Sequence, residues 1–104
     1  MRVIARLDCQ FTYNGVSHKG VVVDVSLKGA LLSSVFLPPV NSEISIRIET
    51  SYLPEPLVLD GRIQRGNWGM TDHGKVGRFG VEFKSPSLAL IKLINQLLAP
   101  KKAL

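Results

Sequence analysis

The sequence predicts a small, mostly β protein: six short antiparallel strands followed by one C-terminal α-helix. Apolar and polar residues alternate in short runs, and glycine, proline and asparagine separate those runs. Only the last part of the chain changes to helical spacing. With 104 residues, 45% of them hydrophobic, the chain is long enough for one core and too short for two ordinary domains. The pattern fits a barrel capped by the helix, and it also fits a split sandwich.

The first two strands are expected to form a hairpin. Ala5 to Tyr13 alternates apolar and polar residues, as a half-buried strand does. Asn14-Gly15 follows, a pair that readily adopts positive φ and reverses the chain, although the loop could continue through Ser17 and His18. The second strand then runs through Gly20 to Ser26.

Three further strands are predicted in the middle of the chain. Ala30 to Ser34 is closed off by Pro38-Pro39, because proline cannot donate to a central ladder. Glu43 to Thr50 alternates most clearly, with one apolar face made of Ile44, Ile46 and Ile48. Leu57 to Arg65 is the next strand, with Gly61 expected as a bulge or bend.

The remainder is predicted as a loop, a strand and a helix. The glycine-rich stretch from Gly66 to Gly77 is expected to be a loop, anchored against the barrel by Trp68. Arg78 to Phe83 returns as a strand. A helix from Ser87 to Leu98 has Ser87 as its N-cap and apolar residues at helical spacing: Leu90, Ile91, Ile94, Leu97 and Leu98. The expected organisation is thus one domain over 1–104, with a mobile segment at 1–6, a barrel over 7–83 and a helix over 87–98.

Composition excludes several classes of site. Cys9 is the only cysteine, so we expect no disulfide and no zinc site, and we expect Cys9 to be a small buried residue. No apolar run is long enough to span a bilayer and no secretory signal is present, so a cytoplasmic protein is expected. The two histidines, His18 and His73, do not accompany a recognisable nucleophile, so we expect no catalysis and no metal. The net charge of +5 favours an anionic partner.

The segment Asp24-Val25-Ser26-Leu27-Lys28-Gly29 carries the most chemistry. It places an acid and a hydroxyl at i and i+2 at the end of a strand, followed by a glycine. A carboxylate can accept the N1 and N2 hydrogens of guanine, a serine can bond to phosphate or backbone, and glycine permits close approach. The same Asp24 and Ser26 could instead satisfy backbone groups of a turn.

The run VVVDVSLKGALL resembles the signature of PilZ domains, D/N-x-S-x-x-G after an aliphatic strand, and Asp24, Ser26 and Gly29 match it position by position. The resemblance extends to the first strand, to Leu57 to Arg65, to Gly80-Val81-Glu82-Phe83 and to the terminal helix. It implies a six-stranded PilZ-like antiparallel β-barrel. It also implies that these three residues bind cyclic di-GMP, and no other cofactor is expected.

PilZ domains complete this site with an R-x-x-x-R pair before the first strand, whose guanidinium groups hold phosphates and stack on guanine. Arg2 and Arg6 have that spacing. In a second register Arg2 is the second arginine of the pair, Arg6 is an outward strand residue, and the first arginine would precede Met1. Both registers stay open. Other cations that could line the ligand side are Lys28, Arg62, Arg65 and Arg78.

The leading hypothesis is therefore a non-enzymatic bacterial receptor that binds cyclic di-GMP and relays the signal to a protein effector, as a monomer or a homodimer. One alternative is a PilZ-like adaptor that does not bind the nucleotide and acts by protein-protein interaction. The other is a small basic barrel that binds single-stranded nucleic acid. That alternative needs exposed strand aromatics, whereas Phe11, Tyr13 and Phe83 fall on faces assigned to the core.

Overall fold

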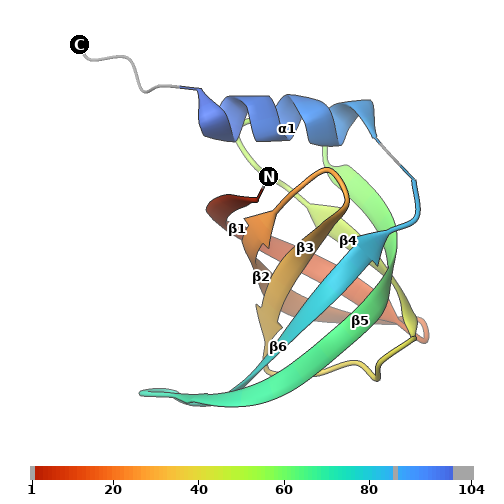
Figure 1. Ribbon diagram of the computed structural model, residues 1–104, viewed down its shortest axis with the longest axis vertical. Coiled ribbons are helices and arrows are strands. Elements are labelled where there is room, and N and C mark those ends of the chain that lie inside the picture. Colours follow the sequence, from red (N-terminus) through yellow and green to blue (C-terminus); the bar gives the residue numbers. More distant parts are fainter. Residues whose placement is uncertain (1, 86, 100–104) are drawn as a thin grey trace.

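The computed structural model describes residues 2–85 and 87–99. Within them the chain forms β1 (Val3–Tyr13), β2 (Val16–Val25), β3 (Gly29–Ser34), β4 (Glu43–Ile48), β5 (Leu57–Thr71), β6 (Gly74–Phe83) and α1 (Leu88–Leu98). The strands make one closed antiparallel barrel in the order β1-β2-β3-β6-β5-β4, and β4 pairs back with β1. Figure 1 shows α1 across one end of the barrel, while the β5–β6 hairpin projects beyond the other. The predicted barrel is confirmed, and the sandwich is excluded.

Alternation along the strands fills the barrel interior with apolar side chains. Ile44, Ile46 and Ile48 all face inward from β4, as predicted. Cys9 is likewise buried. Five of the six strands contribute side chains that are 0% exposed, and β4 contributes Ile46 at 1%, so the core is shared by the whole barrel. The strand residues at 0% are Phe11, Val22, Val25, Leu32, Ile63 and Phe79.

The turn between β1 and β2 is the shortest that the sequence allowed. Asn14 and Gly15 have φ of 49° and 77°, the positive values of a two-residue hairpin turn. Tyr13 pairs directly with Val16, so β2 resumes before Ser17 and the longer loop does not form.

The stretch from Gly66 to Gly77, predicted as a loop, instead forms the two strands of a projecting arm (Figure 1). β5 continues to Thr71 and β6 starts at Gly74. Two of the glycines reflect close packing: a Cβ on Gly66 would lie 2.7 Å from Leu37 Cδ1, and one on Gly77 would lie 3.1 Å from Leu37 Cβ. The glycine-rich composition was therefore wrongly interpreted as loop flexibility.

Trp68 lies on this arm, opposite Gly77 in the ladder. Its indole is 46% exposed, and Lys75 Nζ lies 4.6 Å from the ring centroid. Thr71 closes the turn, because its Oγ1 accepts from His73 N at 3.2 Å and donates to Gly74 O at 2.9 Å. Trp68 thus packs within a regular β-ribbon rather than anchoring a loop.

β1 starts earlier than expected. Val3 is 7% exposed and pairs with Val25, and Ile4 pairs with Asp24. Residues 3–6, assigned from the sequence to a segment outside the barrel, therefore belong to β1, because Val3 contributes to the core. Met1 lies outside the described residues.

The bulge expected at Gly61 lies elsewhere. Gly61 pairs regularly with Ile44 and Phe83, and the register of β5 against β6 shifts between Ile63 and Arg65. Gly61 is required for another reason, since a Cβ there would lie 2.4 Å from Val81 Cγ1 and could not be accommodated without movement.

The terminal helix begins as predicted, with the Ser87 hydroxyl accepting a hydrogen bond from Leu90 N at 3.2 Å. Leu90, Leu93 and Ile94 are buried against the barrel end. The predicted apolar residues Ile91 and Leu98 remain partly exposed, because the buried stripe is narrower than the apolar pattern. Within the described part of the chain, no helix has the length and apolarity needed to cross a bilayer.

Candidate functional site

The six-residue segment from Asp24 to Gly29 links β2 to β3. Ser26 N donates to Gly29 O at 2.8 Å, and the Ser26 hydroxyl accepts from Lys28 N at 3.2 Å and from Gly29 N at 3.3 Å. The hydroxyl therefore holds the turn together. Of the two sequence-based interpretations of Ser26, the turn-stabilising one accounts for the contacts it makes here.

Gly29 lies where β3 meets β6. A Cβ at this position would be 2.2 Å from Val81 O, a separation that no real side chain tolerates. The next residue toward the turn contributes too, because Lys28 O accepts from Phe83 N at 2.8 Å. Glycine is thus required by the approach of the β6 backbone, and the turn is fixed to β6 on one side.

Asp24 lies on the outer face of the barrel because β2 carries a bulge. Val22 pairs with Leu32 and Asp24 with Leu31, so Val23 is an extra residue against β3. A regular strand with Val22 inside would also turn Asp24 inside. The bulge instead aims the carboxylate outward, where it is 20% exposed.

The structure brings Arg2 and Asp24 together. Arg2 Nη1 donates to Asp24 Oδ1, forming an ion pair across the β1–β2 ladder. The register explains the contact, since Ile4 pairs with Asp24 and places the chain just before β1 beside the carboxylate. The aspartate of the motif and one predicted arginine are therefore neighbours, and each is the hydrogen-bonding partner of the other.

Arg6 lies further along β1 and is exposed. It falls within a second irregularity, where Ala5 and Arg6 together face Val23. Arg2 and Arg6 thus flank the Ile4–Asp24 pair, with Arg2 before β1 and Arg6 within it.

Asp24 also begins a row of outward-facing residues that crosses four strands. Asp24 pairs with Leu31, Leu31 with Gly80, and Gly80 with Arg65. The sequence named Arg65 as one of four further cations that could line the ligand side, and did not place it in a row with Asp24. The sequence feature that could have pointed to this part of the row is Gly80, a glycine between Phe79 and Val81 in a short strand.

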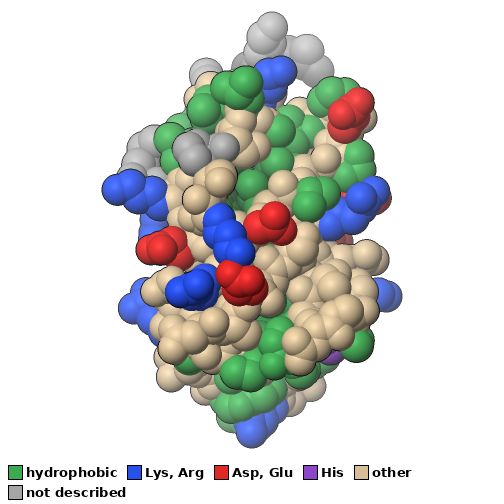
Figure 2. Space-filling view, turned by 90° about the vertical axis from the view of Figure 1, so that its right-hand side faces the viewer, with side chains coloured by type: hydrophobic (Ala, Val, Ile, Leu, Met, Phe, Trp, Pro, Cys, Tyr) green, Lys and Arg blue, Asp and Glu red, His purple; other side chains and the backbone are tan. Residues whose placement is uncertain are grey.

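The remaining candidate cations differ in their surroundings. Arg62 lies 3.8 Å and Lys84 lies 2.5 Å from Glu43 Oε1. Lys84, and to a smaller extent Arg62, lower the pKa of the Glu43 carboxyl below its ordinary value. Lys28 and Arg78 are exposed. Basic and acidic side chains adjoin on the face shown in Figure 2, so that face presents no separate basic field.

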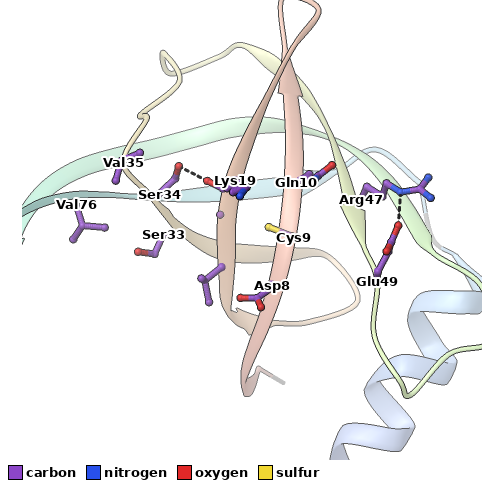
Figure 3. Close-up of a pocket in the computed structure, with 12 residues that line it drawn as sticks. Asp8, Cys9, Gln10, Lys19, Ser33, Ser34, Val35, Arg47, Glu49 and Val76 are labelled. Atoms are coloured by element: carbon purple, nitrogen blue, oxygen red, sulfur yellow. Dashed lines mark hydrogen bonds and ion pairs between the residues drawn. The ribbon is translucent and has the colours of Figure 1, made fainter. Parts of the chain in front are cut away.

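A hollow of about 860 Å³ lies beside the row, over the outer faces of β1, β2 and β3 (Figure 3). Its lining has mixed charge, with Asp8, Lys19 and the Arg47–Glu49 ion pair at 3.1 Å. None of the five residues predicted to bind the ligand lines it. A mixed-charge, open hollow gives no specific recognition chemistry, and the row through Asp24 is the better defined surface.

Cys9 and His18, two other side chains with potential reactivity, are both accounted for by packing. Burial, with a smaller effect of the Asp8 charge, raises the pKa of the Cys9 thiol to about 12, so Cys9 is a poor nucleophile. His18, expected in a loop, lies in β2 and stacks on Phe36 with ring centroids 3.9 Å apart. Among residues 2–85 and 87–99, no three side chains of the metal-binding types form a group.

A family model for the PilZ domain matches residues 1–99. Among solved structures, the chain is similar to the PilZ domain of YcgR from Escherichia coli with c-di-GMP. The identity is 14% and the TM-score 0.72, over 93% of this chain and 88% of that one. It is also similar to PlzA of Borreliella burgdorferi in complex with c-di-GMP, at 14% identity and a TM-score of 0.65, over 86% of this chain and 41% of that one.

A third similar structure is MotI/DgrA, the inhibitor of motility of Bacillus subtilis. It shares 11% identity with a TM-score of 0.70, over 93% of this chain and 47% of that one. The chain thus spans less than half the length of MotI/DgrA and of PlzA. At these identities the likeness establishes the fold. No curated protein matches the sequence.

Proposed function

Because this chain belongs to the PilZ domain family, we propose that it is a non-enzymatic receptor that binds cyclic di-GMP and passes the signal to a protein partner. The observation that carries the proposal is the contact between Arg2 and Asp24 on the outer face of the barrel. One supplies a cation for phosphate and the other a carboxylate for guanine, so the two chemistries that the ligand requires lie together.

Binding proceeds by exchange of partners. The guanine N1 and N2 hydrogens take over the Asp24 carboxylate, which Arg2 occupies in the free protein. Arg2, 55% exposed on its side chain, then turns to a phosphate together with Arg6. Each oppositely charged contact with phosphate is worth about 1.5–3 kcal/mol.

Ser26 and Gly29 contribute indirectly in this mechanism. The Ser26 hydroxyl already accepts two backbone hydrogen bonds, and Gly29 lies under Val81 O. They hold the turn against β6 and so fix the position of Asp24 at the end of β2. A rigid turn lowers the entropy cost of placing the carboxylate for guanine.

Signal relay follows from the same exchange. When Arg2 leaves Asp24 for the phosphate, the residues just before β1 lose one contact and gain another. A partner protein that recognises the rearranged N-terminal residues together with the ligand would distinguish the two states.

Calorimetric titration with cyclic di-GMP tests the proposal. Asp24→Ala, Arg2→Ala and Arg6→Ala each remove one predicted contact, and each is expected to raise Kd by roughly 10- to 150-fold. The matched control is Arg47→Ala, which also removes one positive charge but lies on β4 in a separate ion pair with Glu49. If Arg6→Ala behaves like the control, Arg2 alone engages phosphate and the second register holds.

An adaptor that does not bind the nucleotide is the second candidate. The observation in its favour is that Ser26 and Gly29 both have roles in the fold itself, so they would persist without a ligand. Absence of both heat and thermal shift at about millimolar ligand, far above useful receptor affinities, would contradict the receptor proposal and favour the adaptor.

The nucleic-acid alternative has less support. Phe11 and Phe83 are buried and Tyr13 is half-buried, so these strand aromatics do not offer faces on which bases could stack.

A further inference from the structure

The helix α1 carries apolar side chains on two of its sides. One side packs on the barrel end and is buried through Leu90, Leu93 and Ile94. Leu88, Ile91 and Leu98 point elsewhere and are 79%, 37% and 47% exposed. Figure 1 shows that α1 lies outside the barrel end, so its outer side is free of the strands. A helix that is apolar on more than one side is normally covered on more than one side.

The exposed apolar residues follow the spacing of a coiled-coil seam. Leu88, Ile91, Asn95 and Leu98 are three, four and three residues apart, which corresponds to positions a, d, a and d of a heptad. We call these four residues the outer stripe. Asn95 is exposed like the other three. The stripe therefore has the pattern with which one helix packs along another.

The outer stripe is uncharged in a chain of net charge +5. Lys92 is the one charged residue of Leu88–Leu98, and it lies outside the stripe. An acidic partner would find no opposite charge on this surface. Two copies of the same basic chain, in contrast, repel each other except where they meet through uncharged residues. The charge pattern thus favours a second copy as the partner.

Asn95 favours the same partner. A side-chain amide has both donors and an acceptor, so it can hydrogen-bond to an identical amide. A two-fold axis between two parallel helices brings each a position opposite its own copy, and a single asparagine at a then fixes the register and the two-stranded state. In an antiparallel pair Asn95 would face Ile91 and its amide would be buried without a partner.

We propose that α1 is the contact surface of a parallel homodimer, in which the outer stripe packs against the same stripe of a second copy. Leu88, Ile91 and Leu98 then each meet their own counterpart, and Asn95 pairs with Asn95. The contact lies on α1 and requires no ligand.

The size of the stripe sets the strength of this dimer. The 11 residues of α1 extend over about 16 Å, so the helix pair covers less than the about 800 Å² per partner of a standard interface. The helix is already ordered, since Ser87 caps it and the barrel holds it, and association costs little further ordering. We expect a Kd of roughly 10 µM to 1 mM, as in small transient interfaces.

Sedimentation equilibrium of the whole chain without ligand, from about 5 µM to about 2 mM, tests the proposal across that range. Leu88→Glu places two like charges at the seam and is expected to raise Kd by at least roughly 10-fold. Gln96→Glu is the matched control, because it adds the same charge to an exposed site on α1 outside the stripe. Unchanged thermal unfolding of both variants at the lowest concentration verifies the fold, as expected for exposed side chains.

Oxidative cross-linking tests the orientation. In the parallel dimer two copies of Leu98→Cys face each other within disulfide reach. In an antiparallel pair Leu98 faces Leu88, which places the two copies of residue 98 about 15 Å apart. Gln96→Cys, outside the stripe, is the control. The native Cys9 is buried and does not compete.

Each result decides one part of the proposal. A dimer that is weakened in Leu88→Glu and retained in Gln96→Glu, with cross-linking through residue 98, supports it. A wild type that is monomeric over the whole concentration range overturns it, as does equal dimerisation of the two glutamate variants. Cross-linking of Leu98→Cys no faster than that of Gln96→Cys overturns the parallel arrangement. The receptor proposal is unaffected by any of these results, since no nucleotide is present.

Discussion

The proposed receptor function depends most on Asp24. Its carboxylate already has a hydrogen-bonding partner, Arg2, in the free protein. Arg2 satisfies it in the free protein, so in the proposed binding mode guanine replaces Arg2 on the carboxylate and Arg2 gains a phosphate contact in exchange. Ser26 and Gly29 stand apart from this exchange, since their contacts are within the turn and with β6. At the residue scale, the motif divides into Asp24, whose outward carboxylate is proposed to meet the ligand, and Ser26 and Gly29, which hold the turn in place.

This division predicts the effect of Gly29→Ala on stability. The added Cβ falls 2.2 Å from Val81 O, so the β3 and β6 backbones must separate. We expect the free energy of unfolding to fall by about 1–3 kcal/mol, as for an overpacked core site. Urea denaturation with both proteins at equal concentration measures the difference.

Gly80→Ala is the matched control, because its nearest neighbour would lie 3.7 Å away. It should remain within about 0.5 kcal/mol of wild type. Equal stability of Gly29→Ala and wild type would contradict the structural role assigned to this glycine.

At the element scale, alternation predicted most strands and their inward faces, since each pattern is local. β4 shows this best, with its three isoleucines all inside. The arm formed by β5 and β6 was missed because Gly66 and Gly77 pack against Leu37, a residue far from them in the sequence. The bulge at Gln64 was missed for the same reason, as a register shift appears only when β5 meets β6.

The arm itself yields a prediction about Trp68. Its indole packs beside Gly77 and under Lys75, so Trp68→Ala removes a contact that joins the two strands of the arm. We expect local opening to become easier by about 1–2 kcal/mol, which raises amide exchange in the arm by roughly 5- to 30-fold. Amide exchange followed by NMR measures this, with the core amide of Phe79 expected to stay unchanged.

Met70→Ala is the control for the arm, since Met70 is 79% exposed on the same face of β5. It should leave exchange nearly unaltered. Similar acceleration in both variants would mean that Trp68 does not hold the arm.

At the scale of the whole molecule, closure depends on the pairing of β4 with β1, which joins segments more than thirty residues apart. Composition and alternation left a barrel and a sandwich open, because both bury the same inward faces. The likeness of the motif to the PilZ signature favours the barrel, and the pairing of β4 with β1 establishes it. The position of Arg2 beside Asp24 likewise follows from the β1–β2 register and could not be derived from spacing alone.

Because Cys9 is buried inside the closed barrel, ionisation of its thiol is coupled to global unfolding at alkaline pH. Cys9 pairs with Gly20 on β2 and Ile48 on β4, so its thiol points into the closed ring. Its pKa is raised from 9.0 to about 12, mainly by burial. The unfolded chain therefore releases the proton first as pH rises, and this favours unfolding between those two values.

The expected loss from this one group is roughly 2 kcal/mol between about pH 8 and about pH 10.5. Urea denaturation of the wild type and of Cys9→Ala across this range isolates it, because the lysines and tyrosines titrate alike in both proteins. Stability should fall more steeply in the wild type, whereas the cavity left by alanine lowers stability equally at every pH. Parallel curves would mean that water reaches the thiol in the folded state, and that the barrel opens at β1 without global unfolding.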